Sequence, residues 1–174
     1  ANIGVVNGEV CYGASTGELV VLNPNMNTGY TYSWENANNP GQSIATTTIV
    51  SNLGAGTYVL LADYNNTLGC TSEATFTITS LPMLEITYHT VSDVLCNGGS
   101  TGEVMVVPSV DVVNPTYSWS NGSNTSTASN LQVGTHILTL TDGNDCDQDF
   151  SYTVNEPSAV VVNVTATQTY ILNA

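Results

Sequence analysis

Short runs of alternating apolar and polar residues predict that this chain is built from β-strands. The clearest runs are Tyr30–Trp34, Val104–Val106 and Val160–Val164. Alternation with a period of two residues is typical of strands that bury one face. Turn signals such as Asn-Gly and Asn-Pro-Gly separate the runs at intervals of about ten residues. No segment combines a helical apolar period with caps at both ends, so we predict an all-β fold.

The sequence also repeats itself, which sets the domain organisation. CYGASTGELVV, from Cys11, matches CNGGSTGEVMVV, from Cys96, and the two tryptophans keep the same offset of 85 positions. Further on, LGAGTY, from Leu53, matches LQVGTH, from Leu131, at an offset of 78 positions. Short strands, regular turns and modules of this length predict two Greek-key β-sandwiches in tandem. We place them at residues 1–82 and 83–158.

Residues 159–174 form a separate terminal segment, predicted to be a β-strand. They resemble the first strand of the second module, which follows Pro82, but Ile171 stands where a cysteine is expected. The Val160–Ala174 strand is therefore predicted either to begin a third unit or to be donated to a sheet of another subunit, since a strand can add to an open sheet edge.

Charge composition excludes several functions. The chain of 174 residues has no lysine or arginine, 14 acidic residues and a formal net charge of −14. Nucleic-acid binding requires cations that neutralise phosphates, and none are available. Lysine catalysis and arginine clamps on phosphate are excluded for the same reason. From this charge composition we expect no nucleic-acid binding and a location outside the cell. No apolar stretch is long enough to span a membrane, so we also expect no membrane insertion.

Four aromatic residues are predicted to anchor the cores of the two modules: Tyr32, Trp34, Tyr117 and Trp119. Each Tyr-Ser-Trp repeat places its tyrosine and tryptophan on one face of a strand. A small sandwich needs such large apolar side chains for stability. The alternative is an exposed aromatic stripe on which sugars stack, which would indicate a carbohydrate-binding module.

The cysteines fall two to a module, and the four positions are Cys11, Cys70, Cys96 and Cys146. Four cysteines permit three pairings. One disulfide within each module is the favoured arrangement, and each would stabilise its module by about 4 kcal/mol through loop entropy. A bond between Cys70 and Cys96 across the module boundary is the competing arrangement, and free thiols are a third.

Candidate catalytic and metal-binding residues are few. The stretch TDGNDCDQD suggests calcium ligands, which would be Asp142, Asn144, Asp145 and Asp147. However, a cysteine occupies the fifth position of this loop and no glycine follows, so the EF-hand pattern fails and a structural turn is the favoured alternative. Glu18 and Glu103 match each other but belong to separate modules, so they do not define a glycosidase pair. We expect no enzymatic activity and no cofactor.

The ordered pattern resembles the SprB-type repeats of very large bacterial cell-surface adhesins. It consists of C-x-G-x-x-x-G, then Tyr-(Thr/Ser)-Trp, then Leu-x-x-Gly-Thr-Tyr with a following Asp, then a second cysteine and a closing proline. The first copy carries it in Cys11, Gly13, Gly17, Tyr32, Trp34, Leu53, Gly56, Thr57, Tyr58, Asp63, Gly69, Cys70 and Pro82. The second copy carries it in Cys96, Gly98, Gly102, Tyr117, Trp119, Leu131, Gly134, Thr135, Asp142, Cys146 and Pro157. His136 replaces the tyrosine there.

This resemblance implies immunoglobulin-like or PKD-like sandwiches, secretion, and a role in surface adhesion or gliding motility. The leading hypothesis is an extracellular structural and adhesive module of a cell-surface adhesin or a surface filament. Its partners would be further copies, neighbouring repeats of the same polypeptide or surface glycans. The alternative is a carbohydrate-binding sandwich appended to a larger secreted protein.

Overall fold

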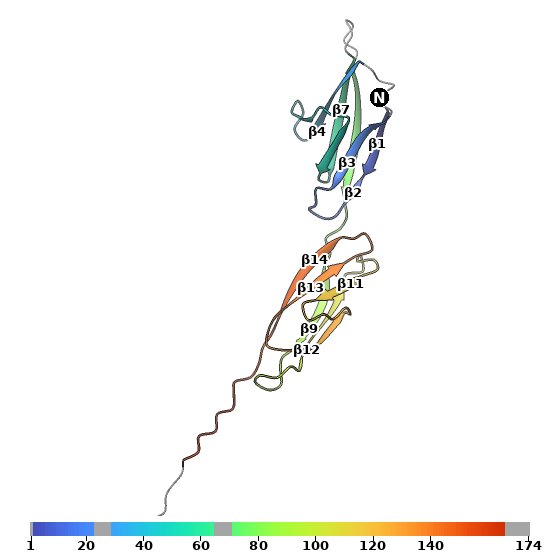
Figure 1. The fold of residues 1–174 in the computed structure, drawn as a ribbon. Coiled ribbons are helices and arrows are strands. Elements are labelled where there is room, and N and C mark those ends of the chain that lie inside the picture. The colour runs from blue at the N-terminus through green and yellow to red at the C-terminus, as the bar shows by residue number, and fades with distance from the viewer. Residues whose placement is uncertain (1, 23–28, 65–70, 166–174) are drawn as a thin grey trace, which may run out of the picture. The chain divides into compact units, whose positions relative to one another are not determined.

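The structure, a computed structural model, describes residues 2–22, 29–64 and 71–165 (Figure 1). All regular secondary structure in these ranges is β-strand, and they contain no helix that could cross a membrane. The chain divides into two compact units, Ala1–Met83 and Leu84–Ala174. Each unit is described by itself below.

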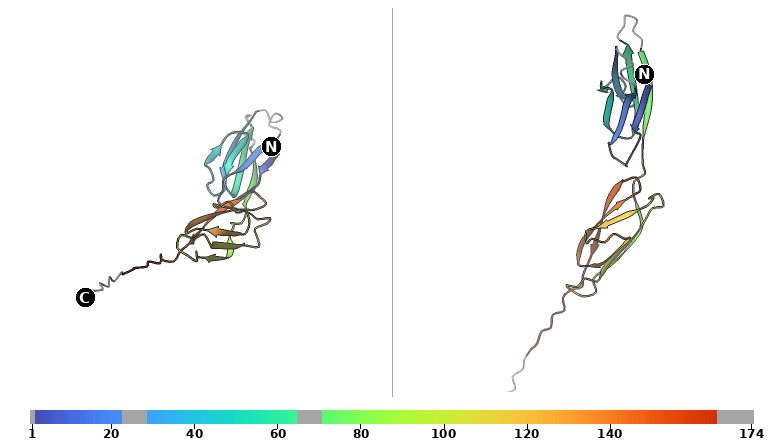
Figure 2. Two further views of the ribbon diagram at one scale, coloured as in Figure 1. Left: turned by 60° about the horizontal axis from the view of Figure 1, so that its bottom comes forward. Right: turned by 45° about the vertical axis from the view of Figure 1, so that its right-hand side comes forward.

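The first unit is a sandwich of two β-sheets (Figure 2). One sheet has the order β1-β3-β6, with β1 at Asn2–Asn7, β3 at Gly17–Leu22 and β6 at Ile49–Leu53. The other has the order β2-β8-β7-β4-β5, with β2 at Glu9–Val10, β8 at Thr71–Ser80, β7 at Gly56–Tyr64, β4 at Tyr30–Asn36 and β5 at Ser43–Ala45. The chain therefore changes sheets at Gly8. All pairs are antiparallel except β2 with β8, which run parallel.

The second unit repeats this arrangement with fewer strands. One sheet has the order β12-β10-β9, with β12 at Thr127–Leu131, β10 at Gly102–Pro108 and β9 at Ile86–Ser92. The other has the order β11-β13-β14, with β11 at Thr116–Trp119, β13 at Gly134–Thr141 and β14 at Asp147–Val154. The parallel pair of the first unit is reduced here to one backbone bond, in which the amide of Val94 donates to the carbonyl oxygen of Asn155 at 2.9 Å.

Each unit has an entry end, where its first strand begins, and an exit end, where its last strand finishes. In the first unit Asn2 pairs with Leu22 at the entry end. Thr71, the first residue of β8, pairs with Asp63 next to the Tyr30–Tyr64 pair, at the same end. Ser80 finishes β8 at the exit end, beside Val10. The last strand of a unit thus spans its whole length.

The core pattern identifies the sandwich as immunoglobulin-like. Such domains pack a tryptophan of the third strand against the second and sixth strands. Trp34 on β4 is 0% exposed and lies in one cluster with Leu19 of β3 and Leu60 of β7. Leucines thus occupy positions where antibody domains carry a disulfide. The fold is therefore an immunoglobulin-like β-sandwich, as the sequence predicted.

A tyrosine corner supports the same assignment. The Tyr58 hydroxyl, at the start of β7, donates a hydrogen bond to the carbonyl oxygen of Gly54 at 2.9 Å, which is the contact that defines this motif. In the second unit His136 takes the tyrosine's place, and its Nε2 lies 2.9 Å from the carbonyl oxygen of Gln132. Since a carbonyl only accepts, Nε2 carries the hydrogen. His136 is therefore a positioning residue of the fold, in agreement with its interpretation as a strand residue.

Candidate functional site

The predicted aromatic anchors lie inside the units. Trp34 and Trp119 are buried, and each indole Nε1–H donates to a backbone carbonyl oxygen, of Thr47 and Thr125 respectively, at 2.9 Å. Tyr32 and Tyr117 are half-buried. Buried indoles with satisfied N–H groups cannot stack on a sugar, so no aromatic platform exists at these tryptophans.

The calcium candidates form a hydrogen-bonded turn. Both carboxylate oxygens of buried Asp142 already have donors: Oδ1 accepts from the amides of Asn144 and Cys146 at 2.9 and 3.0 Å, and Oδ2 accepts from Asn144 Nδ2 at 3.0 Å. Asp145 completes the turn with a left-handed backbone, at φ 61°, and Asp147 begins β14. Among the residues the structure describes, no three acidic, histidine or cysteine side chains are grouped so that they could hold a metal ion.

We expect the Asp142 turn to make the second unit sensitive to acid. Burial raises the pKa of this carboxyl group, but the three hydrogen bonds outweigh burial and hold the pKa below its ordinary value of 3.8. The unfolded chain therefore binds more protons, so the stabilisation is present above pH 3.8 and is lost as the pH falls through the lower folded pKa. Asp142→Ala should cost about 1–3 kcal/mol at neutral pH, and the cost should shrink on acidification. Denaturant unfolding of the native chain and of Asp142→Ala at several pH values measures this difference in stability. An equal cost at all pH values would contradict it.

The cysteines depart from the favoured pairing. Cys96 is an exposed free thiol, whereas Cys11 and Cys146 are disulfide-bonded. The predicted bond between Cys96 and Cys146 is therefore wrong. Cys146 directly precedes β14, and Cys96 lies beside Pro157, beyond the other end of that strand. Eight residues of strand separate these positions by about 25 Å, whereas the Cα atoms of a disulfide lie about 6 Å apart.

The predicted partner of Cys11 was Cys70, which lies outside the described residues. The sequence alone places Cys70 directly before Thr71, the first residue of β8, while Cys11 directly follows β2 at the exit end. The pairing of Cys70 stays a prediction.

The two matching glutamates have a structural role. Glu18 Oε2 accepts a hydrogen bond from Ser51 Oγ at 2.7 Å, and Glu103 Oε2 accepts from Ser129 Oγ at 2.8 Å. Each glutamate therefore joins its strand to the neighbouring strand of the same sheet. The two residues sit at equivalent positions of separate units, which gives them no shared chemistry.

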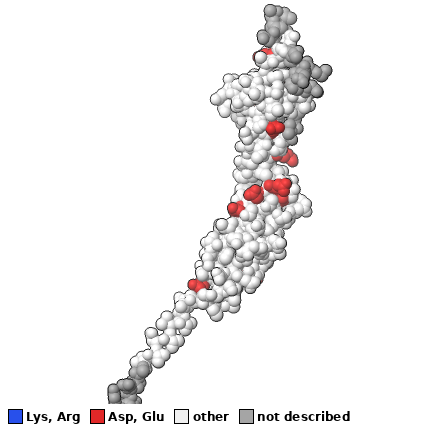
Figure 3. Space-filling view, viewed as in Figure 1, with Lys and Arg blue, Asp and Glu red and all other residues white. Residues whose placement is uncertain are grey.

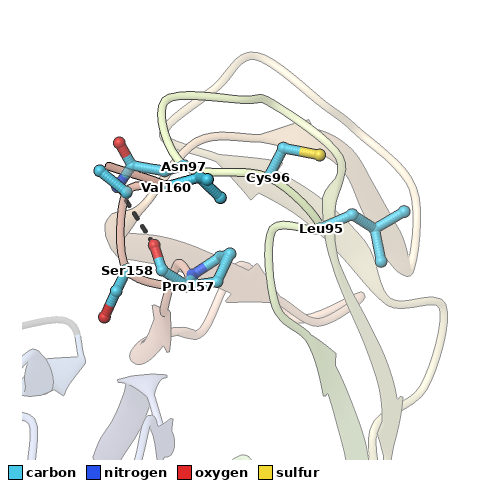
Figure 4. Close-up of a pocket in the computed structure, with 7 residues that line it drawn as sticks. Leu95, Cys96, Asn97, Pro157, Ser158 and Val160 are labelled. Atoms are coloured by element: carbon cyan, nitrogen blue, oxygen red, sulfur yellow. Dashed lines mark hydrogen bonds between the residues drawn. The ribbon is translucent and has the colours of Figure 1, made fainter. Parts of the chain in front are cut away.

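A hollow of about 510 Å³ lies at the exit end of the second unit (Figure 4). The Leu95–Asn97 turn forms one side, and the departing segment Pro157–Val160 forms the other. Asn97 Nδ2 donates to the carbonyl oxygen of Pro157 at 3.1 Å, and the Gly98 amide donates to Glu156 Oε2 at 2.6 Å. These bonds tie the turn to the start of the segment that follows β14.

Exposed apolar side chains line the hollow on both sides. Leu95 is 79% exposed and Val160 is 91% exposed, and Cys96, in the same turn as Leu95, is an exposed thiol. Acidic side chains appear only as separate patches on the view in Figure 3, over an otherwise uncharged surface. Sequence reasoning missed this site because it assigned no role to Leu95. The signal was the change after Pro157, where the repeat is not completed.

Part of the chain matches a protein-family model. Residues 89–124 match the SprB repeat. The expected resemblance is thereby confirmed for this stretch of the second unit, while the second SprB copy, in the first unit, rests on the internal repeat alone. SprB repeats indicate a repeat module of a cell-surface or extracellular protein. Families of SprB repeats and immunoglobulin-like domains are generally not enzymatic. No curated protein shows significant sequence similarity to this chain.

Several solved structures are similar to the chain. Murine CEACAM1b shares 12% identity, with 90% of this chain and 99% of that chain covered and a TM-score of 0.38. Sidekick-1 immunoglobulin domains 1–5 share 11% identity over 90% of this chain and 39% of that chain, with a TM-score of 0.36. Domains 1–6 of the surface layer protein SbsC share 17% identity over 83% of this chain and 23% of that chain, with a TM-score of 0.27.

Proposed function

We propose that this chain is a structural subunit of an extracellular surface filament or adhesin, and that it assembles by strand addition. The SprB match and the immunoglobulin-like fold support a surface repeat module. The observation that carries the assembly step is the segment after Pro157. It leaves the second unit in an extended form, belongs to none of the described sheets, and keeps Val160, Val162 and Val164 largely exposed.

Exposed alternating valines have a simple physical meaning. A strand with apolar residues at every second position gains free energy only when one face is covered. In each unit the first strand joins a sheet through an antiparallel ladder, as β1 does with β3 and β9 does with β10. Residues 159–174 resemble such a first strand. Insertion into the sheet of another copy covers the valines and supplies their backbone hydrogen bonds.

The first test is removal of residues 160–174. The shortened chain should fold, because the described core residues all precede this segment, but it should no longer form filaments. Electron microscopy and sedimentation of the purified chain measure assembly, and circular dichroism measures folding. Filaments from the shortened chain would overturn the proposal.

A pair of single substitutions makes the test specific. Val162→Asp and Asn163→Asp each add one negative charge at adjacent positions that face opposite sides of an extended strand. Val162→Asp should abolish assembly, because the carboxylate would enter the covered face. Asn163→Asp should leave assembly intact. Equal effects would show that charge, and not strand insertion, controls association.

A further inference from the structure

We infer that β14 of the second unit is the edge that receives residues 160–165 of another copy. Each copy would then extend the β11-β13-β14 sheet of its neighbour by one strand. This inference rests on the proposed assembly by strand addition and names the receiving surface. Three features of β14 carry it: its regular pairing, its outward backbone groups and the apolar side chains on its inner face.

β14 is the one long and regular strand at an edge of the described sheets. Proteins protect edge strands from pairing with other chains by keeping them short or by interrupting them with a β-bulge. Five edge strands here pair through a shifted register, and two others have only two and four residues; the first group is β1, β5, β6, β9 and β12, and the second is β2 and β11. β14 has eight residues and pairs with β13 without any shift. It therefore lacks both kinds of protection.

Every second residue of β14 turns its backbone groups away from β13. Just beyond the strand, the Asn155 amide donates to Asp93 Oδ1 at 2.8 Å, and the Asn155 carbonyl oxygen accepts from the Val94 amide at 2.9 Å. Both bonds lie on the side away from β13. Because bonding directions alternate along an antiparallel strand, the odd-numbered residues from 147 to 153 face the same way. Their N–H and C=O groups can pair with an added strand.

The first unit shows that a strand can pair at this position. There the chain that begins the unit passes from β1 to β2, and β2 pairs with the last two residues of β8, the counterpart of β14. In the second unit only the contacts of Asp93 and Val94 with Asn155 remain of this pairing. The strand itself, Asp147–Val154, is therefore left to a segment from elsewhere.

The side chains of β14 that face the core offer apolar surface to an added strand. Tyr152 is buried, and its ring centroid lies 5.7 Å from that of Trp119 and 5.2 Å from that of His89 on β9. Phe150 lies on the same face, two residues earlier, and is only half-buried. The valines of residues 160–165 are 77–91% exposed. Pairing along β14 brings every second one to the face that carries Phe150, so both partners lose apolar surface to water.

Charge does not close this edge. Charged side chains are another common protection of edge strands. On β14, Asp149 Oδ1 accepts a hydrogen bond from Thr139 Oγ1 of β13 at 2.6 Å, so this carboxylate is held toward β13 and away from the edge. Asp147 is the first residue of the strand, and residues 150–154 carry no charge. An added strand therefore meets an uncharged edge over the second half of β14.

Ser151→Pro in the full chain tests the receiving edge. The substitution removes an outward N–H and places a ring where the added strand would lie, but it removes no bond to β13. The variant should fold and form no filaments. The matched control is Thr75→Pro on β8, whose N–H also faces outward because the amide of Thr79, on the same side, donates to the carbonyl oxygen of Gly8. This control should still form filaments. Circular dichroism measures folding, and electron microscopy with sedimentation measures assembly.

Hydrogen exchange of the native full chain decides the question even if the proline variant does not fold. Assembly should slow exchange in the fragment that contains Ser151 and Thr153, compared with the chain kept too dilute to assemble. Filaments in which another edge strand, such as β9, is slowed instead would overturn this inference and leave strand addition standing. Filaments from Ser151→Pro, or equal loss of filaments in both proline variants, would overturn it as well. A native chain that forms no filaments would overturn the proposed assembly itself.

Discussion

Replacing Trp34 by alanine should unfold the first unit or leave it barely stable. The indole is fully buried between the two sheets, and its N–H is bonded to the carbonyl oxygen of Thr47. Truncation of a buried tryptophan costs about 3–5 kcal/mol, since it leaves a large cavity. A loss of this size is comparable with the net stability of a small domain. Thermal unfolding followed by circular dichroism measures it, while the fluorescence of Trp119 reports whether the second unit stays folded.

The matched control is Trp34→Phe. Phenylalanine keeps an aromatic ring in the core but loses the bond to Thr47, so the cost should fall to about 1–2 kcal/mol. If Trp34→Ala left stability unchanged and instead weakened binding to a glycan, the ring would be a surface platform. The carbohydrate-binding alternative would then regain its main support.

Adding a single methyl group at Gly17 should have the second largest effect. A Cβ at this position would lie 2.6 Å from Ile78 Cδ1 and 2.8 Å from the carbonyl oxygen of Leu53. Both distances are below van der Waals contact, the Leu53 oxygen belongs to the backbone, and Ile78 is itself buried. The backbone must therefore move, and overpacking of this kind costs about 1–3 kcal/mol. Denaturant unfolding monitored by Trp34 fluorescence, in a Trp119→Phe background, measures the first unit alone.

Gly54→Ala serves as the control in the same unit. Its Cβ would have Ser15 Oγ as nearest neighbour, at 3.5 Å, and the backbone there is not left-handed. This variant should be neutral or gain about 0.4–1 kcal/mol from a stiffer unfolded chain.

Gly102 repeats the crowded environment of Gly17 in the second unit, where an added Cβ would lie 2.6 Å from Val154 Cγ1 and 2.9 Å from the carbonyl oxygen of Leu131. A harmless Gly17→Ala would show that the sheets can separate locally at low cost.

Local periodicity was sufficient to predict the strands and the burial of the tryptophans. Alternation in Tyr30–Trp34 shows which side chains share a face of the strand. A small sandwich has little other apolar volume for its core, so the face that carries the tryptophan is the buried one. The repeat added the equivalence of the two units. Shared features then appear in pairs, such as left-handed Asn52 and Asn130, each directly before a buried leucine.

The cysteine pairing could not be predicted because it depends on the end of the unit at which each cysteine lies. Count and spacing along the chain say nothing about this. The deciding quantity is the length of the last strand, β14, which places Cys146 before one end and Cys96 beyond the other. The hollow at the exit end was missed for a related reason. It exists because no neighbouring residue covers Leu95, and a sequence repeat does not indicate which side chains remain uncovered.

The parallel pair of β2 and β8 has a consequence for how the first unit bears tension. A pull on its two ends draws β2 toward the entry end and β8 toward the exit end, so the bonds joining Glu9–Val10 to Thr79–Ser80 are sheared together. The eight register pairs of β7 with β8 hold the other edge of the same strand. Bonds loaded in parallel must break at once, and resistance to force follows the unfolding rate and not the equilibrium stability. The unit should therefore resist extension until the bonds between β2 and β8 break.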